Sequence, residues 1–575
     1  MELNSVIHSM NESFAYKRNE HQYVIKLKVK KNDFNNVKLC YCEKYLRERC
    51  VPGNKTYEVN MVKVASTKYH DYYEATISDL VPLNDSLVPA LAIRYFFGLE
   101  SEEDLIYYGN YKFFHYYPTD TMDMFNLVIY QADESFFKTP DWSKGAVIYQ
   151  IFPERFAPTD DNYSSQWFDY PINYKVRTNG TLKGITQKID YLKKLGIDAI
   201  YLNPIFLANT SHRYDTVDYL KIDPLLGDEK DFKELVDTLH KNGIKIILDL
   251  VFNHSSINFF AFKDVLENQE KSKYKDWYFI KEFPISPDDK PVKYMGFSFG
   301  GYMPKLNTSN KECREYLLNV PKYYLEKFDV DGFRLDVADE VTHDFWREFR
   351  KVCKSIKEDT LIMGEIWYES LPYLRGDEFD SIMNYTIFDG IRGLITKKYT
   401  TDEFINIIER ERGESSLNYY HSSNSLIGSH DTTRFYSEVN NSKDKFLLGY
   451  TLLLFLPGSP IIYYGDEIML EGNNTSDCRR GMIFEDSFNK DIRDYFINLI
   501  KLKHLPALKE GDLKVLDREP YIELERSLGD EKYHLIFNVK DEDIYIEHLV
   551  NKYNLLNDTR FDGTLKPYQS LLIKE

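Results

Sequence analysis

The chain has 575 residues, which is too long for one hydrophobic core, so three or four domains are expected. Hydrophobic residues make up 43% of the sequence and charged residues 29%, which is the balance of a folded, soluble protein. The net charge of -18, with no run of lysines and arginines to follow a phosphate backbone, argues against a nucleic-acid partner.

The start of the chain and its cysteines bear on location. Met1 to Asn4 shows no basic start followed by an apolar stretch, so no signal peptide is evident. The longest apolar run, Tyr450 to Tyr464, is broken by prolines and is too short to span a bilayer. The six scattered cysteines indicate reduced thiols. We therefore expect a cytoplasmic protein with no membrane partner.

Residues 1–135 have the pattern of an all-β domain. Ile25, Leu27 and Val29 alternate with lysines, the period of two that is typical of a half-buried strand. A second alternating run begins at Val37. The segment therefore predicts a small N-terminal β-sandwich.

Residues 136–504 alternate apolar runs with helical stretches. Within Lys230 to Asn242, for example, the apolar residues mark one face of a helix. Eight candidate strands lie near residues 147, 200, 247, 333, 363, 382, 427 and 462. Strand-helix alternation of that count predicts a (β/α)8 barrel. The long gap between the third and fourth strands, residues 252–307, predicts an inserted subdomain over the barrel rim.

Strand-like runs return in residues 505–575, for example at Tyr521 to Leu524 and His534 to Phe537, and predict a C-terminal β-sandwich. The predicted fold class is therefore α/β. It is a (β/α)8 TIM barrel with an inserted domain after its third strand, an N-terminal β-sandwich and a C-terminal β-sandwich.

Three acidic residues lie in short motifs after strand-like runs. Asp336 ends Gly-Phe-Arg-Leu-Asp, Glu365 lies in Gly-Glu-Ile-Trp, and Asp431 ends Gly-Ser-His-Asp. A parallel barrel brings the C-terminal ends of its strands to one rim. Three carboxylates meeting there, with arginine and histidine beside them, suit the cleavage of a glycosidic bond.

These motifs, in their order, resemble those of the α-amylase superfamily of retaining glycoside hydrolases, and within it the cyclomaltodextrinase, neopullulanase and maltogenic amylase group. The matching segments are 145–156 (GAVIYQIFPERF), 249–254 (DLVFNH), 332–340 (GFRLDVADE), 364–367 (GEIW), 429–431 (SHD) and 458–467 (GSPIIYYGDE). The marker of the group is 303–307 (MPKLN), where oligo-1,6-glucosidases and α-glucosidases usually carry a Gln-Pro-Asp-Leu-Asn version.

The resemblance implies catalytic roles. Asp336 would be the nucleophile, and Arg334, on the same strand face, would keep its carboxylate ionised. Glu365 would be the general acid and then the general base. The two carboxyls of a retaining enzyme lie about 5 Å apart, which neighbouring strands can supply. Asp431 would bind sugar hydroxyls and favour the distorted transition state.

The resemblance also implies substrate-binding residues. His254 and His430 would hydrogen-bond the sugar at the bond to be cleaved, and Tyr214 would stack under it. Trp367 would line the acceptor side, and Arg479 the donor side. Tyr214 and Trp367 could instead be packing residues, since aromatic side chains at a barrel rim often simply pack.

No cofactor is expected. Many relatives bind calcium just after the first barrel strand, but residues 158–164 and 179–181 of this chain lack several of the oxygen ligands. We therefore predict no metal site. Asp339 stands where the group usually has asparagine, which could alter the acceptor preference.

The implied activity is hydrolysis of α-1,4-glucosidic bonds in cyclodextrins and short maltooligosaccharides, giving mainly maltose and glucose, with some α-1,6 cleavage of pullulan and some transglycosylation. The implied assembly is a homodimer in which the N-terminal domain narrows the active site of the other copy. One alternative is an oligo-1,6-glucosidase, which residues 303–307 disfavour. The other is a catalytically silent carbohydrate-binding protein, which the three carboxylates and Arg334 disfavour.

Overall fold

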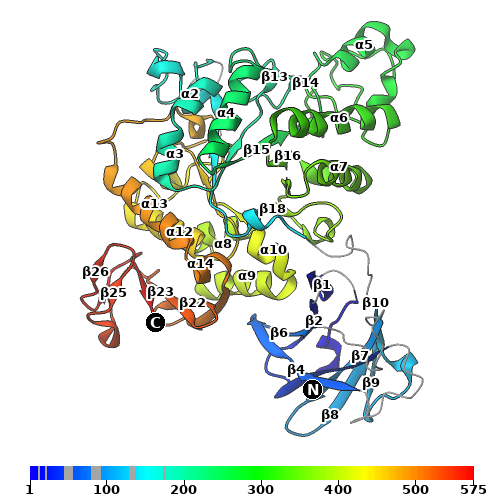
Figure 1. Ribbon diagram of the computed structural model, residues 1–575, viewed down its shortest axis with the longest axis vertical. Helices are drawn as coiled ribbons and strands as arrows, with labels where there is room; N and C mark the ends of the chain where they lie inside the picture. Colours follow the sequence, from blue (N-terminus) through cyan, green and yellow to red (C-terminus); the bar gives the residue numbers. More distant parts are fainter. Residues whose placement is uncertain are drawn as a thin grey trace. The chain divides into compact units, whose positions relative to one another are not determined.

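The computed structural model describes residues 1–10, 13–19, 22–43, 56–78, 92–128, 138–172, 176–474 and 476–575 (Figure 1). They form two units. The first consists of Met1–Lys138, Leu374–Gly376 and Thr400–Tyr420, and the second of Thr139–Tyr373, Asp377–Tyr399 and His421–Glu575. The predicted boundary at residue 135 lies outside the described residues.

Two antiparallel sheets form the predicted N-terminal β-sandwich. Their strand orders are β1-β2-β6-β5 and β4-β3-β7-β8-β9, with β10 beside β7. The strands are β1 Ala15–Asn19, β2 Gln22–Lys30, β3 Asn36–Glu43, β4 Tyr57–Asn60, β5 Val62–Ser66, β6 His70–Ser78, β7 Ala92–Glu100, β8 Leu105–Gly109, β9 Lys112–Phe114 and β10 Phe125–Val128. Ile25, Leu27 and Val29 are fully buried in one core with Leu39 and Phe97 of the other sheet, as the alternation predicts.

The other face of β2, which carries the lysines, is also partly covered. Lys26 is fully buried, and its Nζ donates to the carbonyl oxygen of Ser415 at 2.5 Å. The same nitrogen lies 3.7 Å from a carboxylate oxygen of Glu74. Ser415 directly follows α9 (Thr401–Glu414), which packs against β5 within this unit. A charged side chain is tolerated there because its ammonium is paired and hydrogen-bonded.

The expectation of six reduced cysteines is wrong, because Cys42 is disulfide-bonded. Cys40, Cys313, Cys353 and Cys478 are free thiols, and all four are buried. A disulfide is uncommon in cytosolic proteins, so the cysteines no longer favour a cytoplasmic location.

Eight parallel strands form the predicted barrel in the order β19-β18-β17-β16-β15-β12-β11-β20. They are β11 Ile148–Ile151, β12 Ala199–Leu202, β15 Lys245–Leu250, β16 Gly332–Leu335, β17 Leu361–Gly364, β18 Ser381–Asn384, β19 Asn424–Ser425 and β20 Ile461–Tyr463. Ser459 N donates to Ser423 O at 2.7 Å, which links the two ends of the sheet. The predicted strand positions and the fold class are confirmed.

Helices follow the strands along the chain, as a barrel requires. They include α2 Leu182–Gln187, α3 Ile189–Leu195, α4 Glu229–Lys241, α6 Lys311–Phe328, α7 His343–Ile356, α8 Tyr385–Ile395, α12 Lys443–Phe455 and α13 Lys490–Lys503. Helix α4 shows why they form. Asp228 and Asp231 make a reciprocal capping box at its start, and Phe232, Leu235 and Leu239 bury one face.

The predicted insertion occurs between β15 and β16, at the upper right of Figure 1. It contains α5 (Phe260–Asn268) and otherwise mostly irregular structure. A β-bridge between His254 and Lys305 ties the end of the insertion back to its start. The marker segment 303–307 is thereby fixed beside the motif that follows β15.

The C-terminal domain is built on a four-stranded antiparallel sheet, β21-β22-β23-β28, with two smaller two-stranded sheets. The strands are β21 Asp512–Asp517, β22 Ile522–Leu528, β23 Glu531–Phe537, β24 Ile544–Tyr545, β25 Tyr553–Asn554, β26 Thr559–Arg560, β27 Thr564–Leu565 and β28 Ser570–Lys574. Ile536, Ile544 and Leu571 belong to its core.

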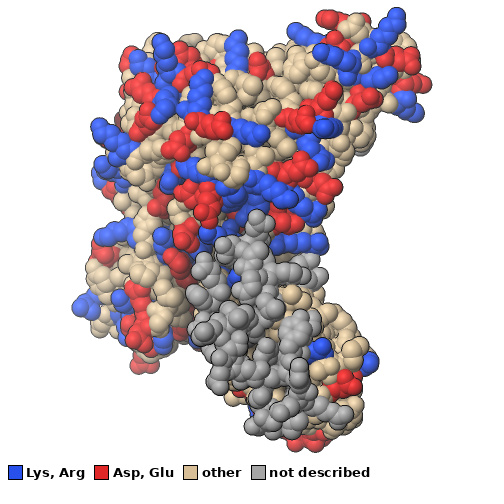
Figure 2. Space-filling view, turned by 45° about the vertical axis from the view of Figure 1, so that its right-hand side comes forward, with Lys and Arg blue, Asp and Glu red and all other residues tan. Residues whose placement is uncertain are grey.

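Two surface properties match the composition. In the described part of the chain, no helix combines the length and the apolar character that crossing a membrane requires. On the face that Figure 2 shows, acidic and basic side chains are interspersed, in keeping with the absence of a basic track in the sequence.

Candidate active site

Two of the three predicted carboxylates are anchored at the ends of barrel strands. Asp336 follows β16 and its N–H donates to Leu250 O at 3.0 Å, while the Glu365 N–H donates to Leu335 O at 2.9 Å. These bonds continue the ladders between parallel strands, so the backbone under both carboxylates is fixed. Asp336 is 6% exposed and Glu365 is 5% exposed.

One guanidinium holds three carboxylates together. Arg334 Nη1 lies 2.9 Å from Asp336 Oδ1 and 2.8 Å from Asp249 Oδ1. Its Nη2 lies 2.8 Å from Glu365 Oε2. Arg334 is fully buried, so little solvent screens these pairs. If all three acids were ionised, the cluster would carry a net charge of about -2 in a nearly dry site, which is costly.

Burial is the largest influence on the acids beside Arg334. It raises the pKa of Asp336 well above its usual range, and it also raises the pKa of Asp249. The Arg334 charge acts in the opposite direction at both groups, as the sequence predicts, but it does not outweigh burial.

Both oxygens of Glu365 accept hydrogen bonds. Oε2 accepts from Val337 N at 2.9 Å, and Oε1 accepts from Trp367 Nε1 at 3.0 Å. Val337 has φ 45° and ψ 48°, a left-handed conformation that β-branched residues rarely adopt. Trp367 is 42% exposed and stacks on Tyr385 with 3.7 Å between ring centroids. Trp367 therefore both packs and orients the carboxylate.

Asp431 has a different environment. It lies 2.9 Å from His430 Nε2 and 3.1 Å from Arg479 Nη2. Burial opposes its ionisation, but His430 and Arg479 outweigh this effect and hold the pKa of Asp431 well below its usual range. Arg479 also donates from Nε to the carbonyl oxygen of His430 at 2.9 Å. An ionised Asp431 is an acceptor suited to sugar hydroxyls.

Tyr214 connects the two parts of the site. Its hydroxyl is 2.6 Å from His430 Nε2 and donates to Asp249 Oδ2 at 2.8 Å. The Tyr214 and His430 rings stack with centroids 5.3 Å apart at an angle of 7°. Tyr214 is only 8% exposed, so the edge that remains accessible is small.

His254 is buried beside the Tyr214 backbone and stacks on Phe297 at 4.9 Å. Burial lowers its pKa to about 3, so the ring is neutral. Its Nε2 has no hydrogen-bond partner among the described residues. A buried polar atom of this kind is suited to a substrate hydroxyl. The structure thus brings together all nine predicted site residues: Tyr214, His254, Arg334, Asp336, Glu365, Trp367, His430, Asp431 and Arg479.

The sequence reasoning missed a layer of supporting residues. Tyr201 donates to Asp249 Oδ2 at 2.6 Å, and Asn203 Nδ2 donates to the Tyr214 hydroxyl at 2.9 Å. Gln150 Nε2 lies 2.8 Å from His430 Nδ1. Asp249 and Gln150 lie within quoted motifs, so their position was a usable signal. Tyr201 and Asn203 lie in or beside an ordinary apolar strand and gave none.

The loop after β11 does not fit a calcium ion. Lys188 Nζ lies 2.6 Å from Asp161 Oδ1, so an ammonium group already binds that carboxylate. Gln187 donates to Asp160 Oδ1 at 2.6 Å, and Asn179 Oδ1 accepts from Ser164 N at 3.0 Å. Calcium needs six to eight oxygen ligands, and one oxygen of each of these two carboxylates is already engaged.

Comparison with known families agrees with this geometry. The family model described as "Alpha amylase, catalytic domain" matches residues 150–498. The chain belongs to the α-amylase family. The model "Alpha amylase, N-terminal ig-like domain" matches residues 1–131 of this family member. Family membership and the intact acidic cluster identify a glycoside hydrolase with a (β/α)8 catalytic barrel.

The relatives of this α-amylase family member include enzymes of one group. A cyclomaltodextrinase of Geobacillus thermopakistaniensis (strain MAS1) is 36% identical over 561 residues, 96% of this chain and 92% of the relative. Neopullulanase 2 of Thermoactinomyces vulgaris is 38% identical over 524 residues, 89% of this chain and 86% of the relative. A solved structure named cyclomaltodextrinase has a TM-score of 0.89 and 31% identity, covering 100% of this chain and 98% of its own.

Proposed function

We propose that this glycoside hydrolase cleaves α-1,4-glucosidic bonds of cyclodextrins and short maltooligosaccharides with retention of configuration. Maltose and glucose are the main products, with some α-1,6 cleavage of pullulan and some transglycosylation. The observation that carries the proposal is the position of Asp336 and Glu365 on the two terminal nitrogens of Arg334. The names of the relatives, cyclomaltodextrinase and neopullulanase, support the substrate class.

In the first step, ionised Asp336 attacks the anomeric carbon and forms a glycosyl ester. The bond from that carbon to the glycosidic oxygen breaks, and Glu365 gives its proton to the departing oxygen. Arg334 stays beside both carboxyl groups, so its positive charge stabilises whichever of them is ionised.

In the second step, Glu365 takes a proton from water, and the water oxygen attacks the anomeric carbon and releases Asp336. A sugar hydroxyl that replaces water gives transglycosylation. Asp431 accepts hydrogen bonds from the hydroxyls of the sugar, and His254 and His430 hold the same unit. Trp367 borders the acceptor side, where its exposed ring can stack on an incoming sugar.

The test is a set of initial rates on β-cyclodextrin, pullulan, soluble starch and isomaltose, with the products and their anomeric configuration determined by NMR. Fast opening of β-cyclodextrin with an α-configured product supports the proposal. Isomaltose as the best substrate would instead assign the oligo-1,6-glucosidase activity. If none of the four substrates is turned over, the protein would be a carbohydrate-binding protein that is inactive despite its intact acidic cluster.

We further propose a homodimer, a cytoplasmic location and no metal cofactor. The proposal assigns a role in assembly to residues 1–131, which match the family's N-terminal domain. One relative is named an intracellular maltogenic amylase of Bacillus subtilis, and the disulfide at Cys42 weighs against the same location here. Sedimentation velocity tests the dimer, which a fully active monomer would contradict. Cell fractionation with antibody detection tests the location.

A further inference from the structure

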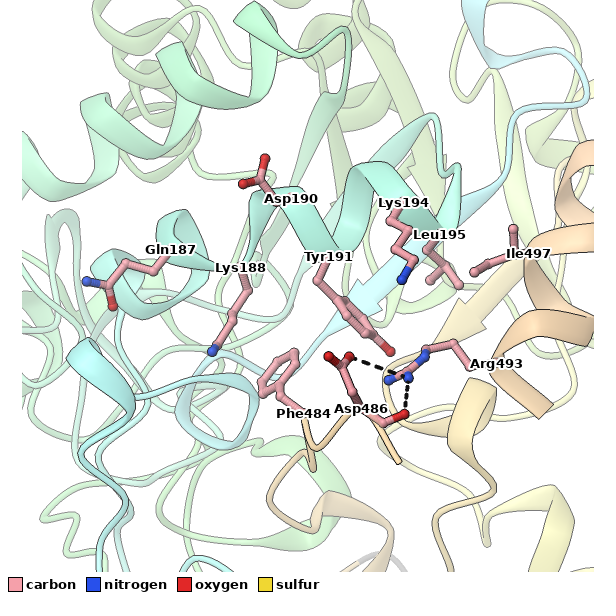
Figure 3. A pocket seen from close by; sticks show the side chains of 10 residues that line it. All are labelled: Gln187, Lys188, Asp190, Tyr191, Lys194, Leu195, Phe484, Asp486, Arg493 and Ile497. Atoms are coloured by element: carbon pink, nitrogen blue, oxygen red, sulfur yellow. Dashed lines mark hydrogen bonds and ion pairs between the residues drawn. The ribbon is translucent and has the colours of Figure 1, made fainter. Parts of the chain in front are cut away.

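A pocket outside the acidic cluster lies between α3 and α13, which contact each other (Figure 3). Its volume is about 310 Å³, within the range of small-molecule sites. None of the residues that line it belongs to the catalytic cluster. The lining includes Lys188, Tyr191, Lys194, Phe484, Asp486 and Arg493.

Arg493 is the polar anchor of the pocket. It is 4% exposed, and its Nη2 donates to the carbonyl oxygen of Asp486 at 2.6 Å. Its Nη1 is buried and makes no hydrogen bond of normal geometry among the described residues, although the guanidinium also acts on the Tyr191 hydroxyl. Leaving a buried donor of a charged group unsatisfied costs free energy, which a ligand oxygen beside Nη1 would recover.

The charges of the pocket are balanced. Lys188 is paired with Asp161 at 2.6 Å, and Arg493 lies 3.6 Å from the Asp486 carboxylate. The two other charged side chains of the lining, Asp190 and Lys194 on α3, also carry opposite signs. A phosphate or another multivalent anion would bind against two nearby carboxylates. The balance therefore favours a neutral ligand with both donor and acceptor groups.

Two aromatic rings provide the apolar part of the pocket. Tyr191 and Phe484 meet edge to face, with centroids 5.2 Å apart and planes at 89°. The Tyr191 hydroxyl donates to the buried carboxylate of Glu467 at 2.6 Å, which fixes its ring. Both rings are partly exposed. The C–H face of a pyranose packs well on such rings, and a ring that is already fixed loses little entropy on binding.

We propose that this pocket is a second carbohydrate site, which binds a neutral α-glucan segment away from the catalytic rim. One sugar unit would contact Tyr191 and Phe484, accept hydrogen bonds from Lys194 Nζ and Arg493 Nη1, and donate to the Asp486 carboxylate. Figure 3 shows the Tyr191 ring with Phe484 on one side, Lys194 above it and the Asp486–Arg493 pair below it. The choice of an α-glucan as the ligand rests on the function proposed above.

The binding test uses the full-length chain with Asp336→Asn, which stops turnover, titrated with maltotriose in a calorimeter. Two classes of site are expected. The added pair Lys194→Ala and Asp486→Ala should weaken one class about tenfold and leave the other unchanged, because each removes a charged hydrogen-bonding group. Both side chains are exposed, so folding should survive, and circular dichroism checks this. Lys193→Ala, on the same helix but outside the pocket, is the matched control.

A kinetic test uses the same pair of substitutions in the active enzyme. KM for soluble starch should rise severalfold, because a long chain can occupy both sites, while kcat/KM for β-cyclodextrin stays unchanged. A single class of maltotriose site, or two classes that the pair leaves unchanged, would overturn the proposal. So would binding of inorganic phosphate, abolished by Lys194→Ala, in place of maltotriose.

The two proposals fail in distinguishable ways. If the wild-type enzyme degrades none of the glucans, the proposed function fails, whatever the titration shows. If it degrades them and the titration reveals only one class of site, the catalytic assignment stands and the pocket proposal alone is wrong.

Discussion

The Glu365 carboxyl receives one backbone and one indole N–H and shares a guanidinium with the nucleophile, a setting that separates its two roles experimentally. We predict that Glu365→Gln lowers kcat for β-cyclodextrin by about 10³-fold, since the leaving oxygen then departs unprotonated. A maltoside with a dinitrophenolate leaving group needs no proton, so its first step should be nearly unaffected. The measurement is stopped-flow release of the phenolate.

The control is Asp336→Asn, which should abolish both phenolate release from the maltoside and turnover of β-cyclodextrin because it removes the attacking oxygen. Equal losses on the two substrates in Glu365→Gln would contradict the assignment of Glu365 as the acid. Unfolding temperatures of both variants near that of the wild type would show that the loss is chemical.

At this scale, the sequence predicts the residues of the acidic cluster better than those that support them. Asp336 and Glu365 are recognisable because each combines a short motif with a strand end. Tyr201 supports the site through Asp249, and Asn203 supports it through Tyr214 and His430, all of them far away in the sequence. The left-handed conformation of Val337 could not be foreseen either, because a β-branched residue is disfavoured there and the fold imposes it.

Single elements carry the next prediction, which concerns the loop after β11. Because Lys188 and Gln187 already occupy its carboxylates, removal of metal ions with EDTA should change neither the rate on β-cyclodextrin nor the unfolding temperature. If EDTA lowered the rate or the unfolding temperature, and added calcium restored it, the loop would bind the ion after all.

The same loop predicts a mild effect of Lys188→Ala. The Lys188–Asp161 pair is partly exposed, so its loss should lower the free energy of unfolding by about 0.2–1 kcal/mol. Urea denaturation measures the change. Lys183→Ala, an exposed lysine of α2, is the control and should have no effect.

The sheet of the C-terminal domain predicts a dependence on pH. His534 Nδ1 lies 2.9 Å from Glu523 Oε1 across β22 and β23, and this bond raises the pKa of His534. A histidine whose folded pKa exceeds the unfolded value of 6.5 stabilises the fold below that pH. The contribution is lost as pH rises through the folded pKa.

The test compares thermal unfolding of the wild type and His534→Gln as a function of pH. The difference in unfolding temperature should be largest below about pH 6.5 and should vanish at alkaline pH. His548→Gln, for which no ion pair is found among the described residues, should leave the pH profile unchanged. If the difference in unfolding temperature grew with pH, protonated His534 would not be the form that stabilises the fold, and the prediction would be wrong.

For the whole molecule, two units with separate cores predict unfolding in more than one step. In a calorimetric scan of Asp336→Asn, maltotriose should raise the transition of the barrel unit and leave the transition of the N-terminal unit in place. A signal that reports on the barrel alone should show only the transition of the barrel unit, and the transition of the N-terminal unit should be absent from it. A single transition that shifts as a whole would show that the units unfold together.

The pattern of apolar runs predicts the barrel because parallel strands are buried on both faces and read as short continuous apolar segments. The pattern does not predict the partner of α9, since an amphipathic helix shows that it covers a surface but not which surface, and α9 packs against β5. The disulfide at Cys42 was missed for a related reason: cysteine spacing alone does not define which thiols meet in space. Local periodicity thus predicts elements better than their partners.

The single guanidinium of Arg334 also constrains how this sequence can change over time. Asp249, Asp336 and Glu365 share it, so replacing any one of them alters the charge that the other two experience. The effects of substitutions at these positions are therefore strongly epistatic. A lineage that loses one acid removes the selective reason to keep the others, so the cluster is expected to persist intact or to decay together.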